Sequence, residues 1–171
     1  MASTVAALVV LNHLLHEQET TIERVAERYA RDMFGWGNTL RTDLVIRLAD
    51  ARIESPGETR TFYLLYIRGL PMPEPQYEIY DANGVLVGRV DFAWPELGVF
   101  LEFDGKAKYQ KYLKPGEDPA DVVVREKQRE DLIRRITGWT CIRLVWADLE
   151  RPDRTAAMIR DVLVGGRRVA G

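Results

Sequence analysis

The stretch GRVDFAWPELGVFLEFDG, residues 88–105, has the pattern of two apolar β-strands joined by a short turn. Each strand carries a carboxylate among its most apolar residues: Asp91 in the first, and Glu102, followed by Asp104, in the second. Burying a carboxylate is unfavourable unless a partner compensates its charge. The function of this stretch depends on what that partner is.

The PELG segment at residues 95–98 is expected to close a hairpin. If Trp94 pairs with Val99 across it, Asp91 lies directly opposite Glu102, with their Cβ atoms about 4.5–5.5 Å apart on one face of the sheet. Like charges in such a pair destabilise a sheet, whereas a divalent cation would bind between them. Mg²⁺ often uses only one or two carboxylates, together with water and substrate phosphate. The register therefore predicts a cation site.

Two further residues are expected on the same face. Asp104 shares it because side chains alternate along a strand. The Asn-Gly pair at residues 83–84 is typical of a two-residue hairpin turn, which pairs Ala82 with Val85 and places Gln76 opposite Asp91. Gln76 is either a polar spacer or a residue of the site.

Length and composition set broad limits. The chain has 171 residues, enough for one domain or one domain with an appendage. Its net charge of -2 means that any contact with nucleic acid must come from a local basic patch. The single cysteine, Cys141, excludes an internal disulfide and a cysteine metal cluster. No apolar run is long enough to span a membrane, so we expect no membrane partner and, by default, a cytoplasmic location.

The order of expected elements indicates an α+β fold. Residues 1–50 are expected to be helical, with a capping box at Thr20 and Glu23, and form a helical N-terminal segment, residues 1–53. A second domain, residues 54–171, is expected to contain helix 57–68, strands 76–81, 86–94 and 98–104, a polar loop 105–120, helix 121–137, strand 140–146 and helix 153–164. This α-β-β-β-α-β order predicts a mixed sheet flanked by helices.

Glu58 has two interpretations. The segment SPGE at residues 55–58 matches a capping box with proline at the first helical position. Glu58 also shares one helical face with Phe62 and Leu65, and packing of that face on the sheet would bring its carboxylate near Asp91. The sequence leaves both roles open.

Basic residues follow the acidic pair in the sequence. The loop GKAKYQKYLKPGED interleaves lysines with tyrosines, among them Lys106, Lys108, Tyr109 and Lys111. This pattern suits contacts with a phosphate backbone and stacking on bases, although a solvated loop has the same composition. On the helix that follows, Arg125, Gln128 or Arg129 could reach the site from its N-terminal half. We therefore expect DNA as a partner.

These motifs resemble, in order, those of the PD-(D/E)XK superfamily of Mg²⁺-dependent nucleases, in particular the branch similar to very short patch repair endonucleases. The matching residues are Glu58, Asp91-Phe92, Glu102-Phe103-Asp104-Gly105, Glu126 or Arg129, Gly138-Trp139 and Arg143-Leu144-Val145-Trp146. The resemblance covers residues 54–150. It implies a restriction-endonuclease-like core that hydrolyses DNA phosphodiester bonds, with Mg²⁺ or Mn²⁺ held by Asp91 and Glu102 and supported by Glu58.

One departure from the family pattern bears on activity. The motif has a lysine two residues after the second acid, and here Asp104 occupies that position. Lys106, Lys108 or Arg129 could replace it. Alternatively, the fold serves as a non-catalytic antitoxin-like or regulatory module that binds nucleic acid, a protein partner or a second copy of itself. Residues 1–50 also resemble the helical segment of actinobacterial AbiEi-like antitoxins, which implies a toxin–antitoxin or phage-defence context.

Overall fold

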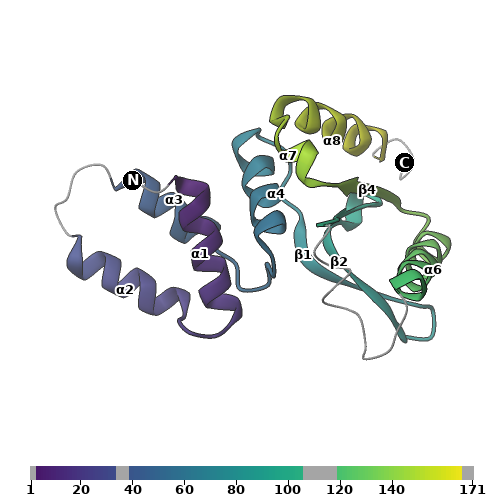
Figure 1. Ribbon diagram of the computed structural model, residues 1–171, viewed down its shortest axis with the longest axis horizontal. Coiled ribbons are helices and arrows are strands. Elements are labelled where there is room, and N and C mark those ends of the chain that lie inside the picture. The colour runs from purple at the N-terminus through teal and green to yellow at the C-terminus, as the bar shows by residue number, and fades with distance from the viewer. Residues whose placement is uncertain (1–2, 34–38, 106–118, 167–171) are drawn as a thin grey trace. The chain divides into compact units, whose positions relative to one another are not determined.

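The computed structural model describes residues 3–33, 39–105 and 119–166, with the backbone alone for residues 119–126. The chain forms two compact units, Met1–Ile67 and Arg68–Gly171 (Figure 1). The sequence predicts a boundary after residue 53, whereas contacts group the helix Pro56–Ile67 with the N-terminal helices. None of the helices in the described ranges is long and apolar enough to cross a membrane.

The N-terminal unit is helical, as expected. Its helices are α1 (Thr4–His16), α2 (Ile22–Asp32), α3 (Leu40–Leu48) and α4 (Pro56–Ile67). Helix α1 packs against α3 and α4, and α2 buries none of its residues. Asn12 is buried within this unit, where it donates to the Thr59 hydroxyl at 3.1 Å and accepts from the Asp50 N–H at 3.0 Å. These bonds tie α1 to α4 and to the turn after α3.

The start of α2 differs from the expected one by one residue. The N-cap is Thr21, whose hydroxyl accepts from the Arg24 N–H at 3.4 Å. The capping box predicted at Thr20 and Glu23 is therefore wrong. Threonine is a favoured N-cap residue at either position, so two adjacent threonines leave the register of the cap undetermined by sequence.

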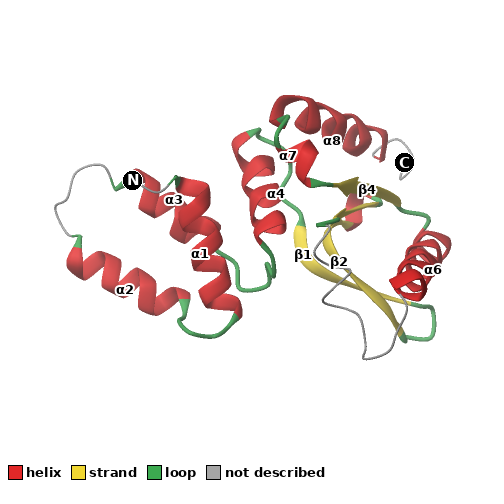
Figure 2. Cartoon of the chain, in the orientation of Figure 1, coloured by secondary structure: helices red, strands yellow, loops and turns green. Residues whose placement is uncertain are grey.

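The second unit is built on a mixed sheet (Figure 2). Its elements are β1 (Glu74–Tyr80), β2 (Leu86–Trp94), the short 3-10 helix η1 (Pro95–Leu97), β3 (Val99–Phe103), α6 (Pro119–Thr137), β4 (Thr140–Leu144), α7 (Trp146–Leu149) and α8 (Pro152–Gly166). The strand order is β1-β2-β3-β4, with two antiparallel pairs followed by the parallel pair β3–β4. The predicted α+β class, with helices flanking a mixed sheet, is confirmed.

Aspartate side chains that bond to the backbone explain two of the differences from the expected strand ends. Asp81 accepts from the N–H groups of Asn83 and Val85, both at 2.8 Å, and the β1–β2 register shifts at Tyr80. The predicted two-residue turn is therefore wrong. Strand β4 ends at Leu144 rather than 146, because Asp148 accepts from the Val145 N–H at 2.9 Å and so caps α7, which begins at Trp146.

The sheet is covered on both faces. On one face, Ile133 of α6 packs with Ala93 and Phe100, and all three side chains are buried. Residues of the opposite parity, such as Phe92 and Leu101, are also fully buried, and α8 contacts β3 and β4. The acids of β2 and β3 therefore lie in a sheet with an apolar core, as the sequence predicts.

Candidate functional site

The register of β2 and β3 is the predicted one. Gly98, with φ of 60°, completes the η1 turn between them. The paired residues are Trp94 and Val99, Ala93 and Phe100, and Phe92 and Leu101. Asp91 and Glu102 are the next residues along the two strands. The hairpin thus brings the two acids to the same level of adjacent strands.

Asp91 is held where the β2–β3 ladder ends. Its Oδ2 atom accepts from the Phe103 N–H at 2.7 Å. In a regular antiparallel ladder that N–H would bond to a carbonyl of the neighbouring strand. The carboxylate has taken the place of that carbonyl, and this bond fixes it beside the residue that precedes Phe103, which is Glu102.

Glu102 has arginine partners on both sides. Its Oε1 accepts from Nη2 of Arg129 at 2.7 Å, and its Oε2 lies 3.7 Å from Nη2 of Arg143. The side chain of Glu102 is only 13% exposed. Arginine therefore supplies much of the charge compensation that the sequence demands.

Arg129 reaches Glu102 by crossing β2. Its Nη1 donates to the Arg89 carbonyl at 2.8 Å. A Cβ at Gly88 would lie 3.4 Å from Cδ of Arg129. That distance is an ordinary van der Waals contact, so the Arg129 side chain lies directly against the strand at Gly88. The prediction that Arg129 could reach the site from the helix is confirmed.

The electrostatics couple the two acids. Burial raises the pKa of Glu102; Arg129 opposes this rise, and the charge of Asp91 adds to it. The net effect is a raised pKa for Glu102, because its ionised carboxylate is poorly hydrated and is repelled by the charge of Asp91. A cation close to both would favour the ionised form of Glu102.

The sequence did not indicate a role for Glu130, an acid on α6. Glu130 is buried and accepts from Nη2 of Arg134 at 2.8 Å and from Arg143. Burial lowers the pKa of Arg143, but Glu130, followed by Glu102, outweighs it and raises the value. The motif comparison gives Arg143 no role. The parallel register of β3 and β4 pairs Arg143 with Glu102, and no local sequence signal specifies that register.

The remaining predicted residues divide into two groups. Asp104 lies at the end of β3, where its N–H donates to the Leu144 carbonyl at 2.8 Å, and its charge contributes to the raised pKa of Arg143. Gln76 lies at the level of Asp91, as predicted, with an unusual φ of 52°. The loop residues Lys106, Lys108, Tyr109 and Lys111 lie outside the described residues.

Glu58 caps helix α4. Its Oε2 accepts from the Glu54 N–H at 3.0 Å and its Oε1 from the Ser55 hydroxyl at 2.7 Å, while Ser55 Oγ accepts from the Glu58 N–H at 3.1 Å. The predicted capping box is thus present. Glu58 belongs to the N-terminal unit, whereas Asp91 and Glu102 belong to the sheet unit. Its role in a metal site stays a prediction.

The donor set suits one kind of metal site. Within residues 3–33, 39–105 and 119–166, no group of three or more His, Cys, Asp or Glu residues is arranged to hold a metal. The Asp91–Glu102 pair offers two carboxylates. Such a pair fits Mg²⁺ or Mn²⁺ that completes its coordination with water and phosphate, and it does not fit a closed structural site.

No protein-family profile and no solved structure matches the chain. The chain is similar to the uncharacterized protein Rv2248 of Mycobacterium tuberculosis strain H37Rv, with 34% identity over 116 residues. It has the same identity over the same length to the uncharacterized protein MT2308 of strain CDC 1551. The match covers 67% of this chain and 39% of each relative, so the chain spans well under half the length of these relatives. Their names assign no activity.

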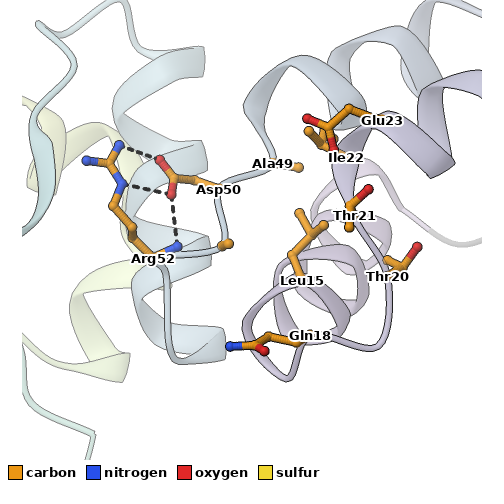
Figure 3. Close-up of a pocket in the computed structure, with 10 residues that line it drawn as sticks. Leu15, Gln18, Thr20, Thr21, Ile22, Glu23, Ala49, Asp50 and Arg52 are labelled. Atoms are coloured by element: carbon orange, nitrogen blue, oxygen red, sulfur yellow. Dashed lines mark hydrogen bonds and ion pairs between the residues drawn. The ribbon is translucent and has the colours of Figure 1, made fainter.

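The N-terminal unit has a shallow pocket of its own (Figure 3). Its volume is about 620 Å³, and its walls come from the end of α1, the start of α2 and the segment after α3. Two charged residues in the wall compensate each other, because Asp50 accepts from the backbone N–H and the guanidinium of Arg52 at 2.7–3.0 Å. Glu23 also lines the pocket, but the charge of Asp50 is already compensated by Arg52.

Proposed function

We propose that the sheet unit is a metal-dependent nuclease domain that hydrolyses phosphodiester bonds of DNA. The observation that carries this proposal is the confirmed hairpin register, which holds Asp91 and Glu102 at the same level where the β2–β3 ladder ends. Two like charges have a cost in a covered sheet, and a cation shared by them relieves it. The resemblance of the motifs to PD-(D/E)XK nucleases supports the same assignment.

Each residue of the site has a proposed role in this reaction. Asp91 and Glu102 would hold Mg²⁺ or Mn²⁺, which when bound polarises a phosphate and lowers the pKa of a coordinated water. Arg129, bonded to Glu102, stands in for the motif lysine as the fixed positive charge beside the acids. Lys106 and Lys108 remain candidates for contacts with the phosphate backbone, together with Tyr109 and Lys111. We place this activity in the cytoplasm.

A specific observation supports a second candidate function. Arg129 already compensates the charge of Glu102, and Asp104 stands in place of the motif lysine. A site stabilised in this way without metal suits a module that binds DNA or a protein partner and does not cut. The toxin–antitoxin context implied by the resemblance fits such a module.

Cleavage assays separate the two candidates. The purified protein is incubated with linear, supercoiled and single-stranded DNA in the presence of Mg²⁺ or Mn²⁺, with EDTA as the control. We expect cleavage that EDTA abolishes. DNA binding without cleavage of any substrate supports the binding module instead.

The variants are chosen to spare the fold. Asp91→Asn keeps an oxygen that can accept from the Phe103 N–H, but it removes the charge. We expect Asp91→Asn and Glu102→Gln each to abolish nearly all cleavage. Cleavage that survives Asp91→Asn would mean that a contaminating nuclease cuts the DNA. Lys106→Ala and Lys108→Ala test the loop: weaker binding with a shallower salt dependence marks a phosphate contact.

A further inference from the structure

The two carboxylate oxygens of Glu102 are treated unequally. Arg129 makes a full hydrogen bond to Oε1 at 2.7 Å. Arg143 stays 3.7 Å from Oε2, which is an ion-pair distance and too long for a hydrogen bond. Arg143 is thus the arginine placed to close on Oε2.

This separation is unexpected from the strand register alone. The parallel pairing of β3 and β4 sets Arg143 directly beside Glu102. Neighbouring arginine and glutamate side chains at such positions attract each other and can form a close pair. Arg143 instead bonds to Glu130 of α6. Its guanidinium is therefore drawn away from Glu102 and towards the helix.

Glu130 is well fixed for this purpose. Its side chain is 12% exposed, and Arg134, one turn further along α6, holds its other oxygen at 2.8 Å. The side chain of Arg143 is 46% exposed, so it has room to move. The buried acid therefore sets the position of the more exposed arginine.

We infer that Glu130 is a positioning residue, which holds Arg143 back from Glu102 and so keeps Oε2 of Glu102 accessible to a divalent cation. This inference rests on the proposed function, because the cation is the one assigned to Asp91 and Glu102. Without Glu130, Arg143 would close on Oε2 and compete with the metal. Glu130 acts only through Arg143 and does not touch the cation.

A double-mutant cycle measures this role through Mn²⁺ binding. Calorimetric titrations with Mn²⁺ alone, without DNA, compare wild type, Glu130→Gln, Arg143→Gln and the double variant. We expect Glu130→Gln to weaken Mn²⁺ binding by about threefold or more, as coupled neighbours commonly do. Arg143→Gln should tighten binding, and the double variant should bind as tightly as Arg143→Gln. Arg134→Gln, whose arginine contacts Glu130 and not Glu102, is the matched control and should have a smaller effect.

Each outcome decides the inference. The inference is overturned if Glu130→Gln leaves Mn²⁺ binding unchanged, or if it weakens Mn²⁺ binding equally with and without Arg143. In either case, DNA cleavage by the wild type would still support the proposed function. Mn²⁺ binding by Arg143→Gln but not by the wild type shows that Arg143 already blocks the site, which also overturns it. No binding by any variant overturns both proposals. The expected cycle without DNA cleavage supports the inference and leaves the nuclease assignment refuted. Thermal melts of every variant establish that it is folded, and Arg143→Gln alone tests the competition if Glu130→Gln is not.

Discussion

At the scale of single residues, three acids of the sheet unit, two on strands and one on α6, have their charges compensated in different ways. Asp91 accepts a backbone N–H, Glu102 accepts a guanidinium, and Glu130 accepts from two arginines. The sequence indicates that the acids of β2 and β3 need partners but not which ones. Arg129 is one of three helix residues that the sequence places within reach of the site, whereas no local pattern indicates the contacts of Arg134 and Arg143.

The capping role of Glu58 leads to a prediction at this scale. Glu58→Ala removes the acceptor for the Glu54 N–H and the Ser55 hydroxyl, and we expect a loss of about 0.5–2 kcal/mol in the free energy of unfolding. Glu58→Gln should keep most of that stability, because glutamine also serves in a capping box. Urea unfolding with and without Mn²⁺ measures both. A metal ligand would behave differently, since Glu58→Gln would then lose the stabilisation that Mn²⁺ provides.

At the scale of elements, the sequence predicts most of the sheet unit. Strand β2 spans Leu86–Trp94, as expected, because turn residues stand at both of its ends. The β2–β3 register follows from the same signals, and with it the juxtaposition of Asp91 and Glu102. What could not be predicted depends on long-range packing: the parallel register that brings Arg143 beside Glu102 is set by how α6 crosses the sheet.

The contact between α8 and the η1 turn gives a prediction for elements. A Cβ at Gly166 would lie 2.3 Å from the Leu97 carbonyl oxygen and 3.2 Å from Cγ2 of Val99. We expect Gly166→Ala to destabilise the protein by about 1–3 kcal/mol, because backbone must shift to admit the methyl group. Gly165→Ala is the matched control: its Cβ meets nothing within 4 Å, so it should be neutral or slightly stabilising. If urea unfolding shows that the two variants lose equal free energy of unfolding, the close contact at Gly166 does not account for the loss.

At the scale of the whole molecule, the chain consists of a helical unit and a sheet unit, and each has its own core. The candidate site belongs to the sheet unit, where apolar residues cover both faces around the acids. Composition predicts such a core but does not locate the division between the units, because the apolar residues of α4 do not indicate which unit they join. Cys141, the single cysteine of the chain, lies on β4, so the reactivity of its thiol can be used to follow unfolding of the sheet unit.

The thiol gives a prediction about unfolding. Burial, followed by the charges of Glu130 and Glu102, raises the pKa of Cys141 to about 12. Since only the thiolate reacts, alkylation by iodoacetamide at about pH 8 should be on the order of a thousandfold slower in the folded protein than in guanidinium chloride. The raised pKa also favours the folded state below about pH 9, and this contribution is lost as the pH rises towards 12. Similar alkylation rates for folded and unfolded protein would contradict the partial burial of the thiol.

The bond from the Phe103 N–H to Asp91 has an evolutionary consequence. Aspartate and asparagine codons differ by a single base, and the asparagine side chain retains an oxygen that can accept the same bond. A point mutation at this position could therefore change the charge of the site while the strands keep their pairing. Proteins with this sheet would then lie one mutational step from a form that binds without metal chemistry, and the loss of one activity would leave a folded protein on which selection could act for another.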